Sequence, residues 1–350
     1  EEVGYDDLDE DGPQKFDTTG GWLGFTDKYW MTALVPDQTE PVKSQFTHQQ
    51  INGKPVYQAD YLMGARTVEA GSTTTVTHRM FAGAKRVDVI DHYNEDGGIT
   101  RFDLAIDWGW FYFLTKPTFF LLDWFYTHVG NFGIAIILLT FLYKLAFFPL
   151  ANKSYESMSK MKKVQPELMK LRETHKDNPQ AQQQAMMELY KKEKVNPLAG
   201  CLPMLIQIPV FFSLYKVLFV SIEMRHAPFF GWIQDLSAPD PTTLFNLFGL
   251  IPFDASAVLP DFMMIGVWPL AMGISMFAMQ KLNPPPTDQM QARIFQLMPI
   301  FFTFLLARFA SGLVVYWTFN NLLSLAQQYL IMRRMGVAIG GGAVKEEPKA

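Results

Sequence analysis

The stretch that decides the fold is Val129–Leu150, which runs V-G-N-F-G-I-A-I-I-L-L-T-F-L-Y-K-L-A-F-F-P-L. Its length of about 20 residues is what an apolar helix needs to cross the hydrocarbon core of a bilayer. The one charge in this stretch is Lys144. An ionisable group at membrane depth costs at least ~2.5 kcal/mol unless it faces water, a partner or a cavity. Lys144 therefore marks a candidate functional site.

Composition divides the chain into a water-soluble part and a membrane part. Of the 350 residues, 49% are hydrophobic, and they include 30 Phe, 8 Trp and 19 Met. Residues 1–130 carry 20 acids and 10 bases, whereas nearly all the long apolar runs lie within 131–333. We therefore expect one soluble domain and one membrane domain. The single cysteine, Cys201, excludes an intrachain disulfide and a two-cysteine metal site, and we interpret it as a core residue.

Loop charges predict the orientation of the membrane domain. Loop 151–197 has ten Lys/Arg and six Asp/Glu, whereas loop 223–261 has five acids and Arg225 as its one base. The excess of positive charge places the first loop and the C-terminus in the cytoplasm. An odd number of spans then leaves residues 1–128 outside. The predicted spans are about 129–150, 198–222, 262–280, 294–308 and 313–332, followed by a flexible cytoplasmic tail, 335–350.

An external N-terminal domain requires an export signal or an earlier span. Residues 1–30 contain no apolar segment of that kind. We therefore expect that at least one further N-terminal segment belongs to this protein.

Residues 1–107 are predicted to form the C-terminal part of an antiparallel β-sandwich. Segments rich in β-branched and aromatic residues predict the strands, and Asn52-Gly53 and Ala82-Gly83 predict turns between them. The predicted strands are Tyr29–Val35, Val56–Leu62, Thr73–Phe81 and Lys85–Ile90.

Residues 108–128 are predicted to form an amphipathic helix in the outer headgroup layer. Ten of the nineteen residues 108–126 are aromatic, with Lys116 and Asp123 between them. Trp and Tyr favour the membrane–water interface. Pro117 and the two charges argue against a further span.

Loop 151–197 is predicted to fold as a cytoplasmic pair of antiparallel helices. Apolar residues recur at helical spacing from Met158 to Leu171, and Asn178-Pro179 is a typical start for a second helix. Methionine-bearing surfaces suit varied apolar partners. The alternative is that the methionines pack the two helices together and the lysines touch lipid headgroups. The candidate contact residues are Met158, Met161, Lys162, Lys163, Met186 and Met187.

Several motifs along residues 108–335 carry a family resemblance. They are K-M-K-K-V-Q-P at 160–166, E-L-Y-K at 188–191, N-P at 196–197, G-C-L-P-M-L-I-Q-I-P at 200–209, R-H-A-P-F at 225–229, W-I-Q-D-L-S at 232–237 and S-G-L-V-V-Y-W at 311–317. In this order and spacing they resemble the bacterial YidC membrane-protein insertases, relatives of the mitochondrial and chloroplast insertases. Residues 20–107 match more weakly.

The resemblance implies a five-helix core around a hydrophilic groove, open to the cytoplasm and to lipid and closed on the outer side. It also implies nascent membrane-protein clients, the ribosome and signal-recognition targeting machinery, the Sec translocon and membrane lipids as partners, in a bacterial inner membrane. The groove charge in the family is usually arginine, and Lys144 stands at the matching position. Lysine keeps the charge but loses the forked guanidinium, which puts a bidentate carboxylate contact in doubt.

The candidate groove residues come from three predicted spans. Thr140 lies one helical turn before Lys144, on the same face. The alternative for Lys144 is that its long stem carries the ammonium to the interface. Lys216 and Arg308 lie nearer the outer ends of their spans, and we expect their side chains to reach the membrane–water interface in this way. The full set is Lys144, Thr140, Gln207, Tyr316, Trp317 and Asn320, with Asn321 beside them.

We therefore predict a membrane protein insertase and chaperone that works without nucleotide hydrolysis, metal, cofactor or nucleic-acid recognition. The chain has no G-x-x-x-x-G-K-[ST] motif, and the spans offer no cluster of catalytic groups, so an enzyme is not expected. A secondary transporter or channel is the alternative, although the two halves show no repeat.

Overall fold

The computed structural model describes residues 2–176, 178–196, 202–252, 255, 258, 260, 263–283 and 289–337. The chain forms two compact units. The first runs to Trp108 and includes Phe219–Glu223, and the second comprises Gly109–Leu218 and the chain from Met224 onward. The predictions for Cys201, the start of the span 262–280 and the tail beyond Val337 lie outside the described residues.

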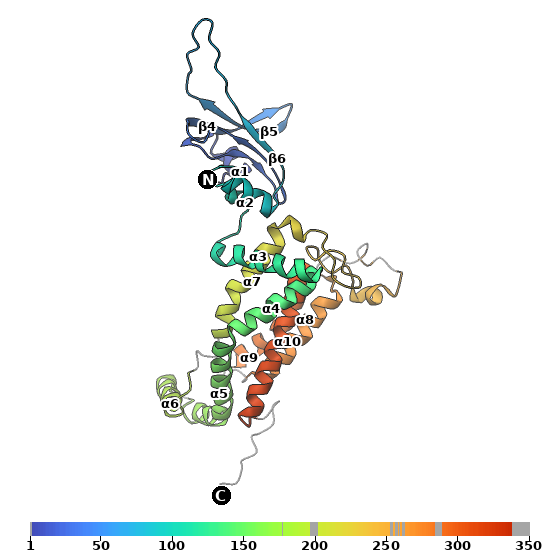
Figure 1. The fold of residues 1–350 in the computed structure, drawn as a ribbon. Coiled ribbons are helices and arrows are strands. Elements are labelled where there is room, and N and C mark those ends of the chain that lie inside the picture. The colour runs from blue at the N-terminus through green and yellow to red at the C-terminus, as the bar shows by residue number, and fades with distance from the viewer. Residues whose placement is uncertain are drawn as a thin grey trace. The chain divides into compact units, whose positions relative to one another are not determined.

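Two three-stranded antiparallel sheets build the first unit, as the predicted sandwich requires (Figure 1). The strand orders are β1-β4-β5 and β2-β3-β6. Asn52 and Gly53 both have positive φ and join β4 to β5, as a two-residue hairpin turn needs. The strands are β1 (Gln14–Thr19), β2 (Leu23–Thr26), β3 (Trp30–Val35), β4 (Pro41–Ile51), β5 (Lys54–Met63) and β6 (Arg79–Ala84).

Alternating side chains supply the core of this unit. On β3, Met31, Ala33 and Val35 are buried while their neighbours face outward. The helical elements of the unit are α1 (Tyr5–Glu10), α2 (Val87–Glu95), η1 (Phe102–Ala105) and η3 (Ile222–Met224), of which the last begins in the 219–223 segment.

Three local predictions for this unit differ from the structure. The expected strand Lys85–Ile90 is largely helix α2, whose buried residues Val87 and Ile90 stand three apart, a spacing that a short β-branched run does not distinguish from a strand. The expected turn Ala82-Gly83 lies inside β6, where Gly83 pairs with Met31. The expected strand Thr73–Phe81 begins only at Arg79.

Helices make up the second unit, and a helix covers much of the described part of each of the five predicted spans. In Figure 1, α4, α8 and α10 run side by side, and α10 packs against both α4 and α8. Gly273 on α8 permits a close approach of α9, because a Cβ there would lie 2.1 Å from Thr303 Oγ1. The five helices are α4 (Phe132–Ala146), α7 (Leu202–Val220), α8 (Val267–Leu282), α9 (Gln289–Leu306) and α10 (Ser311–Arg334).

The predicted span 129–150 is not one helix. Helix α4 ends at Ala146, and α5 (Phe148–Thr174) leaves at an angle of 69°. Pro149 explains the break, because it has no N–H to donate to the Leu145 carbonyl and its ring would clash with that oxygen. The last part of the predicted span therefore belongs to the first turn of α5.

Helix α5 pairs with α6 (Pro179–Lys192), as the sequence predicts for 151–197. The Asn178 side chain accepts a hydrogen bond from Ala181 N at 3.1 Å, so Asn178 is the N-cap of α6, and Pro179 follows it. Helix α3 (Tyr112–Val129) covers most of the aromatic segment 108–128 and packs on α4.

One loop holds together the N-terminal ends of α4, α8 and α10. Asn131, the N-cap of α4, donates to the Phe229 carbonyl at 3.1 Å. Asp240 accepts from the Trp268 N–H in the first turn of α8 at 2.9 Å. The Gly312 N–H in the first turn of α10 donates to the Leu236 carbonyl at 2.9 Å. The contacts of Trp268 and Gly312 satisfy backbone N–H groups that a helix start leaves without partners. The short element η4 (Leu244–Gly249) follows this loop.

Among the described residues, no single helix has both the length and the mean hydropathy expected of a membrane span. The bent pair α4 and α5 reaches that threshold together, and α7 and α9 contain shorter apolar stretches.

Candidate functional site

Lys144 lies in the last turn of α4 and reaches α10. Its Nζ donates to Ser324 Oγ at 2.7 Å. The hydroxyl it meets is buried, since Ser324 is 3% exposed. Among the described residues, no carboxylate forms an ion pair with Lys144. A neutral hydroxyl therefore holds the ammonium group, and its charge is not cancelled locally.

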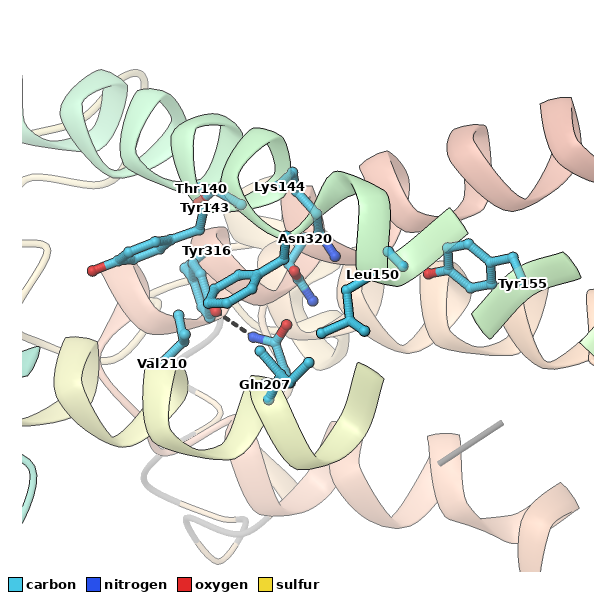
Figure 2. Close-up of a pocket in the computed structure, with 12 residues that line it drawn as sticks. Thr140, Tyr143, Lys144, Leu150, Tyr155, Gln207, Val210, Tyr316 and Asn320 are labelled. Atoms are coloured by element: carbon cyan, nitrogen blue, oxygen red, sulfur yellow. Dashed lines mark hydrogen bonds between the residues drawn. The ribbon is translucent and has the colours of Figure 1, made fainter. Parts of the chain in front are cut away.

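A pocket of about 50 Å³ lies beside this ammonium (Figure 2). A cavity of roughly 10–15 Å³ by this measure holds one water, so the pocket has room for several. Helices α4, α5, α7 and α10 all contribute to it. The lining residues are Thr140, Tyr143, Lys144, Phe147, Leu150, Ala151, Tyr155, Ile206, Gln207, Val210, Tyr316 and Asn320.

The polar side of the pocket is a stripe along α10. Tyr316, Asn320 and Ser324 follow one another at intervals of four and share a face of the helix. Tyr316 is 2% exposed, and its hydroxyl accepts a hydrogen bond from Gln207 Nε2 of α7, the dashed line in Figure 2. The structure thus brings together the predicted residues Lys144, Gln207, Tyr316 and Asn320.

Besides Lys144, two polar side chains of α4 line the pocket, and their hydroxyl groups form hydrogen bonds with atoms outside the pocket. The Thr140 hydroxyl donates to the Ile136 carbonyl of its own helix at 2.7 Å. The Tyr143 hydroxyl lies 2.5 Å from Thr118 Oγ1 of α3 and points away from Lys144 (Figure 2). The Thr140 hydroxyl can therefore accept a hydrogen bond from a molecule in the pocket but has no proton left to donate.

Trp317 does not line the pocket, which corrects its predicted placement. One residue after Tyr316 the helix has turned by about 100°. The Trp317 ring instead packs on Phe211 and Phe302, with centroid distances of 4.8 and 5.9 Å. Asn321 likewise faces α8, where its Nδ2 donates to Ser275 Oγ at 3.1 Å.

The hairpin residues divide into a packed and an exposed group. Met161 and Met186 pack against the cluster of Val164, Leu168, Leu189 and Val195 that joins α5 to α6, as the alternative reading of the methionines expects. Met187 is 50% exposed, and Met158 is half-buried. Of the predicted methionines, Met187 is therefore the most open to a partner.

The two hairpin lysines also differ. Lys163 Nζ donates to the Met335 carbonyl at 2.9 Å, at the end of α10. Lys162 Nζ is buried without a hydrogen-bond partner among the described residues, and this burial lowers the pKa of Lys162 below its usual value. The Lys162 ammonium thus does not face outward as a headgroup contact would.

Ser324 and Tyr155 belong to this site, and the sequence predictions omit both. Ser324 accepts the hydrogen bond from Lys144, and the buried Tyr155 side chain lines the same pocket from α5. Spacing alone could have found Ser324, because it continues the four-residue stripe of Tyr316 and Asn320. No pattern in the sequence pointed to Tyr155, which reaches the pocket only because the chain bends at Phe147.

Comparison with known proteins identifies the family. The 60Kd inner membrane protein family matches residues 124–338, and the YidC periplasmic domain family matches residues 1–121. The chain belongs to the YidC insertase family. Its two matched regions correspond to a sheet-containing domain and a helical insertase core.

Curated YidC relatives are similar over most of this chain. The membrane protein insertase YidC of Agrobacterium fabrum (strain C58 / ATCC 33970) is 56% identical over 335 residues, which cover 96% of this chain and 55% of the relative. That of Methylobacterium radiotolerans is 59% identical over 321 residues, 92% of this chain and 51% of the relative. That of Brucella suis biovar 1 (strain 1330) is 58% identical over 323 residues, which cover 92% of this chain and 52% of the relative. The chain thus spans about half the length of the curated relatives it matches.

Among solved structures, an active YidC insertase crystal structure with the first transmembrane domain resolved aligns with 90% of this chain and 79% of that one. The sequence identity is 20% and the TM-score 0.49.

Proposed function

We propose that this chain is the part of a membrane protein insertase that receives client segments and passes them into the inner membrane. The observation that carries the proposal is the Lys144 ammonium, held by one neutral hydroxyl beside a pocket with polar groups from four helices. The name of the relatives, membrane protein insertase, supports the same function.

The outer surface of the helical unit supports immersion in lipid. Large apolar side chains are exposed on α4, α7, α9 and α10, which a water-soluble surface rarely shows over so many neighbours. We propose that these helices and α8 are the five spans, with 151–197 and the C-terminus in the cytoplasm. Examples are Leu145, Leu205, Leu297, Phe301 and Leu330, each above 50% exposed.

Helix α3 fits a position in the plane of the outer headgroups. It exposes Phe113, Phe120 and Trp124 while it buries Thr118 and Leu122 against the unit. An apolar outer face that contains tryptophan and tyrosine favours the interface between water and lipid.

The physics of insertion follows from a polar pocket within an apolar exterior. A hydrophilic client segment cannot exchange its water for lipid, because lipid offers no hydrogen bonds. A groove with water and side-chain hydroxyl and amide groups lowers that cost, and one positive charge attracts acidic residues of the segment. The apolar span of the client then moves sideways into lipid and loses its contact with water. This route needs no nucleotide.

We propose that the exposed side of the hairpin receives the client first. Met187 and Met169 are each 50% exposed and adaptable in shape. The proposed partners are nascent membrane proteins, the ribosome and signal-recognition machinery that deliver them, the Sec translocon and membrane lipids.

Crosslinking from the pocket tests the proposal. A photo-reactive amino acid at Gln207, which lines the pocket, should crosslink to a ribosome-bound nascent membrane protein. The same amino acid at Phe277, on the exposed face of α8, should crosslink mainly to lipid. Loss of client insertion on depletion of the protein is the matching result in cells. Failure of Gln207 to contact any client, together with solute uptake by the purified protein in liposomes, would favour a transporter instead.

A further inference from the structure

A short uncharged stretch before α8 exposes several large apolar side chains. Residues 241–252 read P-T-T-L-F-N-L-F-G-L-I-P and contain no Asp, Glu, Lys, Arg or His. Single exposed apolar residues are ordinary on a water-soluble surface, whereas a group of them in one short segment indicates a surface that something covers. The group, which we call the η4 patch, consists of Leu244, Phe245, Leu247, Leu250 and Ile251, each between 41% and 83% exposed.

The backbone under the η4 patch satisfies its polar groups internally. The Phe248 N–H donates to the Thr243 carbonyl at 2.8 Å, and the Ile251 N–H donates to the Asn246 carbonyl at 3.0 Å. The Asn246 side chain accepts from the Gly249 N–H at 2.9 Å. An N–H without a partner would oppose transfer into an apolar medium, because lipid offers no hydrogen bonds. These internal hydrogen bonds therefore make the segment suited to contact with lipid.

The chain bends sharply within the patch. Leu247 and Phe248 have φ angles of 48° and 58°, in the left-handed region that bulky residues seldom adopt. Such a backbone conformation costs on the order of 1–3 kcal/mol and persists only where other contacts hold it. Glycine or asparagine at these positions would remove the cost if the segment were a mere connection. The conformation therefore indicates a role for the apolar side chains themselves.

Hydrogen bonds fix the patch to the start of α8. The Leu244 N–H donates to the Ile265 carbonyl at 2.9 Å. Two residues earlier, Thr242 Oγ1 accepts from the Val267 N–H in the first turn of α8 at 3.0 Å. In Figure 1 this golden segment lies at the same end of the helical unit as α3. The position of the patch is therefore coupled to that of the first turn of α8.

We propose that the η4 patch is a second membrane anchor, which enters the outer leaflet beside the start of α8. The idea rests on the proposed function, in which α8 is a span and α3 lies in the outer headgroup layer. The patch is joined to a helix that itself exposes Ile274 and Phe277. Because the patch has no charge, it contacts the glycerol and upper acyl region of the lipids and not a charged headgroup. Together with α3 it fixes the depth of the helices in the bilayer.

Depth-dependent quenching of fluorescence tests the anchor on the purified full chain in nanodiscs, without any client. In a Cys201→Ser background, Leu250→Cys and Phe245→Cys each carry one environment-sensitive fluorophore. Lipids with a nitroxide near the headgroup quench a probe in the interface, and iodide quenches a probe in water. Gln234→Cys, at an exposed polar position of the same loop, is the matched control. Ile274→Cys, at a position 62% exposed on α8, reports on the span.

The two patch probes should lose most of their fluorescence to the shallow nitroxide and little to iodide, and the probe at position 234 should show the reverse. The probe at position 274 should be quenched best by a nitroxide deep in the acyl chain. Quenching at position 250 should be equal in bilayers of neutral lipid and in bilayers that contain anionic lipid, because the patch carries no charge.

Quenching of position 250 by iodide and not by lipid would overturn the anchor, because the patch would then face water. Protection from both quenchers would also overturn it and would show that a protein surface covers the patch. Quenching that requires anionic lipid would overturn it in favour of a headgroup site. The outcome is separable from the proposed function: iodide quenching of position 274 would contradict α8 as a span, whereas lipid quenching of 274 with a water-exposed position 250 removes the anchor and leaves the span.

Discussion

At the residue scale, the ionic environment of Lys144 determines what it can do. Its one hydrogen-bond partner among the described residues is the neutral Ser324 hydroxyl. A positive charge without a local counter-ion can attract an acidic group that enters the pocket, whereas a carboxylate partner would have cancelled most of this attraction. Snorkelling toward the interface does not describe this side chain, because its ammonium turns inward to α10.

Replacement of Lys144 should separate clients by their charge. An attraction between unit charges 4 Å apart is worth roughly 1–4 kcal/mol between bulk water and a protein surface. Lys144→Ala should therefore lower insertion of a client with an acidic translocated segment by at least roughly fivefold, and affect a strongly apolar client less. Lys144→Arg should retain activity, and Lys144→Glu should be worse than alanine because like charges repel. Insertion of paired clients that differ only in the acidic residues of the translocated tail measures this.

The matched control for the lysine series is Lys153→Ala, on the exposed side of α5. It removes a lysine from the same region without touching the pocket. Equal insertion of both paired clients by wild type and by Lys144→Ala would remove Lys144 from the mechanism.

At the element scale, the hairpin is held by its own small core. Leu168 is 1% exposed within the cluster that joins α5 to α6. Leu168→Ala should destabilise the hairpin by about 2–5 kcal/mol, since it removes buried methyl groups and leaves a cavity. Limited proteolysis should then cut residues 151–196 faster while the other helices stay resistant. Met187→Ala, at a half-exposed position, should change the cleavage rate little; a similar rate for both variants would mean that the two helices do not depend on this core.

Helix α2 carries the pH-sensitive contact of the first unit. Glu223 Oε1 accepts from the Val87 N–H at 2.9 Å, and Oε2 is buried without a hydrogen-bond partner among the described residues. Burial raises the pKa of Glu223 above its usual value of 4.5, against the opposing effect of the Val87 hydrogen bond. The folded chain therefore binds this proton more tightly than the unfolded chain. The contribution of Glu223 to stability is greatest below pH 4.5 and decreases as pH rises through the raised pKa.

Glu223→Gln should remove that pH dependence. The amide keeps an oxygen for the Val87 N–H and takes away the buried charge, so α2 should exchange its amide hydrogens more slowly than wild type at neutral pH. Protection factors of α2, corrected for intrinsic exchange and measured from pH 5 to pH 8, check this. Parallel pH profiles in wild type and Glu223→Gln would show that the carboxyl is not the group responsible.

At the scale of the whole molecule, orientation is the prediction most exposed to test. The loop charges predict that 151–197 lies in the cytoplasm and 223–261 outside. Single cysteines at Gln180 and Gln234, both exposed, in a Cys201→Ser background provide matched reporters. An impermeant thiol reagent added to intact cells with a permeable outer membrane should label position 234 and not 180, and inside-out vesicles should reverse the pattern. Labelling of position 180 from outside would overturn the topology.

The sequence was sufficient where a local pattern has one physical meaning. Asn178-Pro179 is a favoured helix start, because asparagine caps the free N–H groups of the first turn. Asn52-Gly53 is a favoured two-residue turn, because both residues tolerate the positive φ that this turn requires. Polar residues four apart on α10 share a face of the helix, so Tyr316 and Asn320 could be grouped. Lys144 could be added to this group as the lone charge of an apolar segment. Where a short pattern fits two structures, the prediction failed: the β-branched run at Val87 was predicted as a strand but starts helix α2, whose Val87 N–H donates to Glu223, 136 residues away.

The sequence by itself determined the division into a sheet domain and a helical domain and the helical hairpin, and it marked Lys144 as a candidate site residue, because composition, periodicity and a lone charge in an apolar run are local properties. Only the tertiary structure decided what Lys144 touches. The chain bend at Pro149 brings Tyr155 of α5 back to the pocket, and the packing of α4 on α10 sets Ser324 opposite the ammonium, 180 residues along the chain. The rotation of α10 that turns Tyr316 inward also turns Trp317 into an apolar cluster. Which side chains meet depends on how helices pack, and packing is a property of the folded chain as a whole.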